Sequence, residues 1–178
     1  MDARKEENSL EVVSVRLVKD APILSEHKIK SPQDAVAVLG DILCDLDREV
    51  VCVVNLKADG TPINCHFASM GSINQSIISP REIFKSSILS NAASMILVHN
   101  HPSGSLHPSK EDIETTARMI ELCHMMGIPL SDHIIVGGDN RKYFSLCEKG
   151  MMENPDTARS ADEKGSRDGS RKAAERSR

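Results

Sequence analysis

Two histidines, His99 and His101, follow directly on the apolar run Met95–Val98. A run of this length and composition is typical of a buried strand. Because side chains two residues apart on a strand point to the same side, both imidazoles would face one point if the strand continues to His101. The spacing therefore predicts a pair of nitrogen ligands at the end of a buried strand.

A carboxylate can complete this pair. Seven residues separate His101 from Ser109, and Asp112 follows three positions later, so a loop could bring Asp112 back to the histidines. Two imidazoles and one carboxylate leave a fourth tetrahedral position open for water, as in catalytic zinc sites. Structural zinc sites are closed by four ligands, usually including cysteine. We therefore predict Zn²⁺ bound by His99, His101 and Asp112.

Ser109 and Asp112 also have a structural interpretation. Ser109 to Asp112 has the pattern of a capping box that begins a helix, in which the serine and the acidic side chain bond to each other's backbone. The two roles are compatible, because a carboxylate in the first helical turn lies at the positive end of the helix dipole. That position favours its ionised form and suits it to bind a cation.

A further acidic side chain precedes the apolar strand that begins at Val50. A zinc-bound water has a pKa of about 7, and a carboxylate within hydrogen-bond reach can take its proton and pass it to a leaving amine. Glu49 is suited to this role, but Asp47 lies only two residues away and fits the sequence equally well. A solvated charge with no chemical role is the other interpretation of Glu49.

The pattern HxH, seven residues, Ser, two residues, Asp resembles the JAMM metalloprotease motif of the JAB/MPN superfamily. Further blocks resemble the RadC family in the same order, from about Glu49 to Gly150. They are Ser79–Phe84, Asn91–Ala93, Leu97–Gly104, Pro108–Asp112 and Asp132–Gly137. Full-length RadC proteins carry an N-terminal helix-hairpin-helix region, whose Gly-rich hairpins do not occur before Glu49. The chain is therefore similar to short, single-domain RadC-like JAB proteins.

This resemblance implies an α/β fold of the JAB/MPN (cytidine-deaminase-like) type. We expect a sandwich with a central mixed β-sheet, partly closed on itself, and flanking helices. It also implies a metallopeptidase or isopeptidase that cleaves an amide bond in a protein or peptide substrate. In that family pattern Glu49, rather than Asp47, is the general base and then the acid. Ser109 would donate its hydroxyl to the developing oxyanion, a contribution of about 3 kcal/mol in other hydrolases.

Two other functions fit the same motif. One is a non-catalytic JAB domain that binds a partner in a DNA-repair or mobile-element system, and the presence of zinc with an open water position would distinguish the enzyme from it. The other is a zinc-dependent nuclease. The net charge of −4 weighs against direct duplex binding, because phosphate neutralisation by basic residues supplies most of the non-specific affinity for DNA.

The length of 178 residues and the hydrophobic content of 39% fit one globular domain with tails. We expect a flexible segment 1–9, the domain at 10–152 and a disordered charged tail at 153–178. The chain has no apolar run long enough to span a membrane, and its first residues do not resemble a signal peptide, which favours the cytoplasm. Five widely spaced cysteines are expected to be reduced thiols in the core.

Hydrophobic periodicity and capping residues predict the elements that would carry these groups. The predicted strands are 10–18, 50–56, a partner strand to about 67 after a turn at 58–60, 94–98, 133–136 and 142–146. The predicted helices are 32 to about 46 with Ser31 as N-cap, 79 to about 93 with Glu82 as a capping residue, and 109–126 with Gly127 at its end. Of the other histidines, His107 is expected to be exposed and His133 to be a core residue or a hydrogen-bond partner of a ligand.

Overall fold

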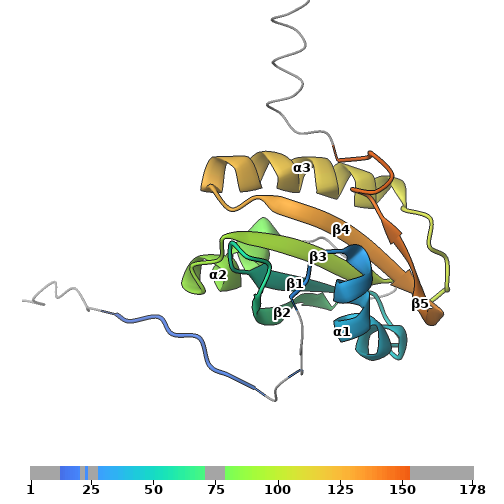
Figure 1. The fold of residues 1–178 in the computed structure, drawn as a ribbon, viewed down its shortest axis with the longest axis horizontal. Helices are drawn as coiled ribbons and strands as arrows, with labels where there is room; N and C mark the ends of the chain where they lie inside the picture. The colour runs from blue at the N-terminus through green and yellow to red at the C-terminus, as the bar shows by residue number, and fades with distance from the viewer. Residues whose placement is uncertain (1–12, 21–22, 24–27, 71–78, 153–178) are drawn as a thin grey trace, which may run out of the picture.

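The computed structural model describes residues 13–20, 23, 28–70 and 79–152. These residues contain three helices and one five-stranded sheet, drawn in Figure 1. The predicted segments 1–9 and 153–178 lie outside the described residues. Within the part of the chain that is described, no helix combines the length and apolar composition needed to cross a bilayer.

The sheet has the strand order β2-β1-β3-β4-β5. Its strands are β1 (Val50–Leu56), β2 (Pro62–Met70), β3 (Ser94–Asn100), β4 (Leu130–Gly137) and β5 (Asp139–Ser145). β3 and β4 run parallel, and the other neighbouring pairs are antiparallel. The mixed sheet confirms the predicted α/β class. It is open rather than partly closed, because β2 and β5 form its two edges and do not pair with each other.

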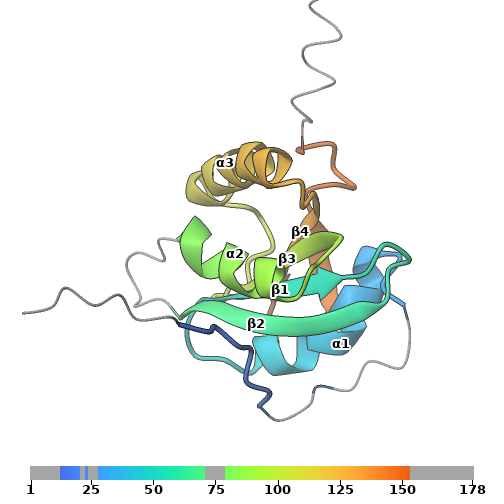
Figure 2. The same ribbon diagram turned by 90° about the vertical axis from the view of Figure 1, so that its left-hand side faces the viewer.

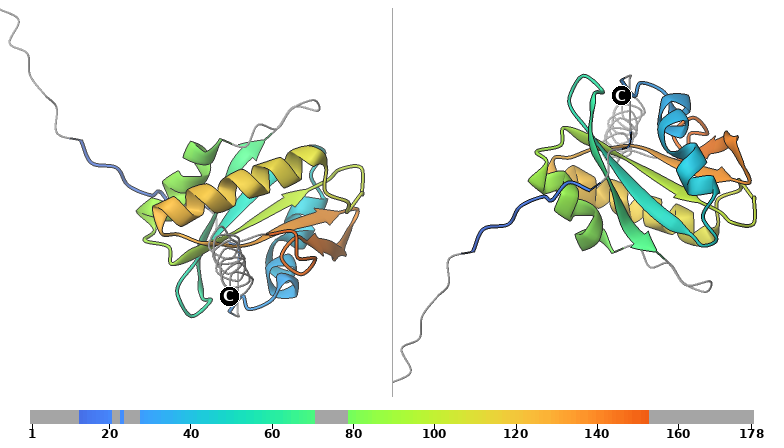
Figure 3. Two further views of the ribbon diagram at one scale, coloured as in Figure 1. Left: turned by 90° about the horizontal axis from the view of Figure 1, so that it is seen from above. Right: turned by 90° about the horizontal axis from the view of Figure 1, so that it is seen from below.

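Helices cover both faces of the sheet, as Figure 2 shows from the side and Figure 3 from above and below. α1 (Pro32–Cys44) packs on one face, whereas α2 (Pro80–Leu89) and α3 (Lys110–Met126) pack on the other. Alternate residues of β1 serve the two cores, with Cys52 on the α1 side and Val53 on the α3 side. A strand buried on both faces has a continuous apolar sequence for this reason.

The helix ends predicted from capping residues are found at Ser31 and Gly127. Ser31 caps α1 by accepting a hydrogen bond from the amide of Asp34, and Pro32 occupies the first turn. α3 ends at Gly127, whose φ of 67° lies in the left-handed region that glycine adopts without penalty. Its amide donates to the carbonyls of Cys123 and His124.

Other sequence predictions are wrong in detail. Residues 13–18 of the predicted first strand are not part of a sheet, and Val13 and Val15 are exposed. α2 ends four residues early, because Asn91 adopts a φ of 50°, which a helix cannot continue through. Ser79 makes no side-chain capping bond, and Glu82 pairs with Lys85 instead of capping the helix.

The five cysteines are free. Cys52 and Cys123 are buried in the two cores, as predicted, and Cys44 and Cys65 are partly buried. Cys147 is exposed, because it lies in the turn that follows β5 rather than in a strand, so the prediction of a core thiol is wrong there.

Candidate metal site

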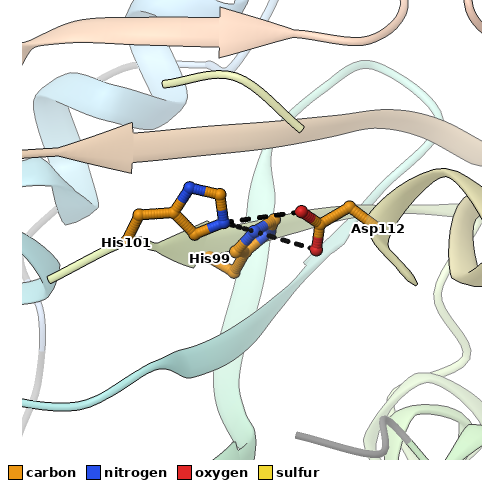
Figure 4. Close-up of side chains that lie close together, drawn as sticks. All are labelled: His99, His101 and Asp112. Carbon is orange, nitrogen blue, oxygen red and sulfur yellow. Dashed lines mark hydrogen bonds and ion pairs between the residues drawn. The ribbon is translucent and has the colours of Figure 1, made fainter. Parts of the chain in front are cut away.

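The three predicted ligands converge at the end of β3, as Figure 4 shows. The Nε2 atoms of His99 and His101 lie 3.0 Å apart. One carboxylate oxygen of Asp112 lies 3.3 Å from Nε2 of His99, and the other lies 3.4 Å from Nε2 of His101. All three ligand atoms fall within 4.8 Å of one another. Two imidazole nitrogens and a carboxylate oxygen are a donor set that zinc accepts.

Burial differs across the site. His99 is 3% exposed and His101 is 9% exposed, whereas Asp112 is only partly buried. His99 is therefore the most enclosed of the three, whereas the side chains of His101 and Asp112 are exposed to a similar extent, 10% and 14%. His99 and His101 share a side of β3, as their spacing predicts, while the side chain of the intervening Asn100 is directed elsewhere.

The hydrogen bond at the rear of His101 determines which ring nitrogen faces the site. Its Nδ1 lies 2.8 Å from the carbonyl oxygen of Ser105. A carbonyl can only accept, so Nδ1 carries a hydrogen. When the ring is neutral, the lone pair is therefore on Nε2, which faces His99 and Asp112; when the ring is protonated, Nε2 donates to Asp112. The loop after β3 thereby prepares His101 to act as a ligand.

Charge at the site favours a bound cation. Burial alone would raise the pKa of Asp112, but hydrogen bonds from His101 and His99 outweigh it and hold the pKa well below its usual range. The same contact with Asp112 raises the pKa of His101 against the effect of burial. His133 behaves differently, because burial lowers its pKa to about 3 and keeps the ring neutral.

Ser109 and Asp112 form the capping box that the sequence predicts. The hydroxyl of Ser109 accepts from the amide of Asp112 at 3.1 Å and donates to its Oδ2 at 2.7 Å. The amide of Ser109 donates to the same Oδ2 at 2.7 Å. This reciprocal contact fixes the carboxylate in the first turn of α3. An oxyanion role for Ser109 requires its hydroxyl to turn away from Asp112.

Glu49 directly precedes β1, the strand that pairs with β3. The last paired residues at this end of the two strands are Val51 and His99. The charge of Glu49 contributes to the raised pKa of His101. Asp47, the rival in sequence, pairs with Arg48 at 2.8 Å, and that contact lowers the pKa of Asp47. Of the two acidic residues, Glu49 is therefore the one whose charge acts on His101, whereas Asp47 pairs with Arg48.

Two further residues contact the site without having been predicted. Asn100 accepts from the amide of Val50 at 2.8 Å and donates to the carbonyl of Arg48 at 2.9 Å, so it holds the backbone on both sides of Glu49. Thr116, one helical turn after Asp112, bonds to the buried ring of His133. Thr116 lies four residues after Asp112 and so on the same face of α3. This spacing was the sequence signal that could have pointed to Thr116.

His107 and His133 behave as the sequence predicts. His107 is exposed in the loop before α3. His133 is fully buried, with its Nε2 atom 2.8 Å from Nδ1 of His99.

Comparison with known proteins identifies the family of the chain. The family model for the RadC-like JAB domain matches residues 29–151. A UPF0758 protein of Clostridium beijerinckii is 43% identical over 130 residues, which are 73% of this chain and 56% of that protein. A UPF0758 protein of Desulforamulus reducens is 45% identical over 124 residues, covering 70% of this chain and 54% of the relative.

The chain thus spans about half the length of these curated relatives. The family match covers the whole sheet, all three helices and the His-His-Asp cluster. The chain belongs to the RadC-like JAB domain family.

Proposed function

We propose that this domain is a zinc-dependent hydrolase that cleaves an amide bond in a protein or peptide substrate. The observation that carries the proposal is the convergence of His99, His101 and Asp112, whose ligand atoms lie within 4.8 Å of one another. The set contains no thiolate and provides three ligands, which is typical of zinc sites that keep one position for chemistry.

A zinc ion held by these residues would supply Lewis acidity, which polarises an amide carbonyl and acidifies water. Glu49, whose charge acts on His101, would accept the proton of the attacking water and return it to the leaving amine. Ser109 would donate its hydroxyl to the oxygen on which negative charge develops.

Metal content tests the proposal directly. The full chain is produced without a histidine tag, purified without chelator, supplied with zinc and washed, and its metal is measured by inductively coupled plasma mass spectrometry. We expect about one zinc per chain in the natural protein and none in His101→Ala. His107→Ala is the matched control, because it removes an exposed histidine from the same loop. A natural protein that retains no zinc would refute the proposal and favour a partner-binding domain.

A further inference from the structure

We propose that Thr116 and His133 are positioning residues that fix the tautomer of His99, so that its Nε2 presents a lone pair to the metal site. The inference rests on the proposed function for the ligand role of His99. The inference is argued from three hydrogen bonds that link α3, β4 and β3 and end at Nδ1 of His99. In each bond the donor and the acceptor can be identified.

The order of donors begins at Thr116. Its Oγ1 lies 2.6 Å from the carbonyl oxygen of Asp112, one turn earlier in α3. A carbonyl only accepts, and a hydroxyl has a single hydrogen, so the hydrogen of Thr116 is committed to Asp112. The same Oγ1 lies 2.6 Å from Nδ1 of His133. Thr116 can only accept there, and Nδ1 of His133 must therefore carry a hydrogen.

The next step passes through His133. His133 is 0% exposed, and among the described residues its two ring nitrogens bond to the hydroxyl of Thr116 and to the imidazole of His99. An imidazolium buried between uncharged partners would be costly, so the ring is neutral. With its one hydrogen on Nδ1, Nε2 of His133 is an acceptor, 2.8 Å from Nδ1 of His99.

The hydrogen bond with His133 determines which ring nitrogen of His99 carries a hydrogen. Its Nδ1 donates to His133, so in the neutral ring the unprotonated nitrogen is Nε2, which faces His101 and Asp112. The carbonyl of Ser105 imposes the same arrangement on His101. Both imidazoles are thereby prepared as ligands, and the backbone of the Asp112 turn is connected to His99 through Thr116 and His133.

Removal of one hydroxyl would interrupt this order. In Thr116→Val the shape of the side chain is kept, but Nδ1 of His133 loses its acceptor. His133 can then carry its hydrogen on Nε2 and donate to Nδ1 of His99, which moves the hydrogen of His99 onto Nε2 and blocks the lone pair. Thr116→Ser keeps the hydroxyl and is the matched control.

Two measurements on the full chain test this. Two-bond ¹H–¹⁵N correlation spectra of the metal-free, histidine-labelled protein report which ring nitrogen carries the hydrogen. We expect the Nδ1–H form of His99 in the natural protein and in Thr116→Ser, and a substantial Nε2–H population in Thr116→Val. Zinc affinity, measured by competition with a chromophoric chelator, should fall about 10-fold or more in Thr116→Val and stay unchanged in Thr116→Ser.

Other outcomes separate the two proposals. An unchanged His99 tautomer and an unchanged zinc affinity in Thr116→Val would overturn the positioning role. If Thr116→Val does not fold, the His99 tautomer of the natural protein tests the proposal instead. A natural protein with the His99 hydrogen on Nε2 would overturn the positioning role. If His99 has the expected tautomer but the natural protein binds no zinc, the proposed function fails while the positioning of His99 stands.

Discussion

At the scale of single residues, the side chains on β3 alternate between two tasks. His99 and His101 face the candidate metal site, whereas Asn100 between them bonds to the backbone at Arg48 and Val50. Glu49 lies between those two backbone groups. One tripeptide thus supplies two ligands and also holds the segment that carries the proposed general base.

Glu49→Gln should separate metal binding from chemistry. The amide cannot accept a proton, so hydrolysis of a peptide or isopeptide substrate found by screening should fall by about 10²- to 10⁴-fold. Zinc should stay, because Glu49 lies outside the His-His-Asp cluster. Turnover and metal content are the two measurements. Asp47→Asn should change neither, and loss of zinc from Glu49→Gln would contradict the assigned role.

Asn100→Ala should destabilise the fold without removing a ligand. The change leaves the amide of Val50 and the carbonyl of Arg48 without their side-chain partner, at a cost of about 2 kcal/mol in the free energy of unfolding. Urea denaturation measures the loss. Stability equal to that of the natural protein in Asn100→Ala would show that Asn100 does not hold this segment.

At the scale of elements, the site depends on a close approach between β4 and the loop after β3. The amide of His101 donates to the carbonyl of Val136 at 2.8 Å. A Cβ at Gly137 would lie 3.1 Å from the carbonyl carbon of Gly104. Because the neighbour is backbone rather than a flexible side chain, the Gly104 segment would have to shift by a few tenths of an ångström to admit a side chain at Gly137.

Gly137→Ala should therefore disturb the site from a distance. Pushing Gly104 away weakens the support of the Ser105 carbonyl behind His101, so zinc affinity should fall, and the steric conflict should cost about 1–3 kcal/mol in stability. Chelator competition and urea denaturation measure the two effects. Gly127→Ala is the control, since its cost of about 1 kcal/mol comes from a φ of 67° alone. Zinc affinity should stay unchanged in the control, and equal behaviour of the two variants would contradict this role of Gly137.

The helices and strands also show which features the sequence could predict and which it could not. α3 was predicted almost to the residue, because Ser109, Asp112 and Gly127 are local signals that act within their own turns. The alternation at residues 13–18 marks which side chains could share a face but cannot reveal whether a neighbouring strand exists. The ligands were predictable from spacing and family resemblance. The contacts of Asn100 and Thr116 depend on how elements far apart in the sequence align and pack against each other. Hydrophobic periodicity does not reveal that arrangement.

At the scale of the whole molecule, a bound metal would connect β3 to α3 and so stabilise the native state. Zinc at 100 times its Kd should add about 2.7 kcal/mol. For a chain of this size, that shifts the melting temperature by about 5–10 °C. Differential scanning calorimetry with zinc and then with excess chelator measures the shift. His101→Ala should show no response to either, and an equal response in that variant would place the metal elsewhere.

The continuous path β3-α3-β4 also has an evolutionary consequence. His99, His101, Asp112, Thr116 and His133 all lie between Ser94 and Gly137, whereas Glu49 arrives from the antiparallel strand on the other side of β3. The residues proposed for metal binding and for proton transfer therefore lie in separate stretches of sequence and can be inherited or lost independently. A descendant that replaced only the segment around Glu49 would keep the His-His-Asp cluster and could be recruited as a binding protein without being rebuilt.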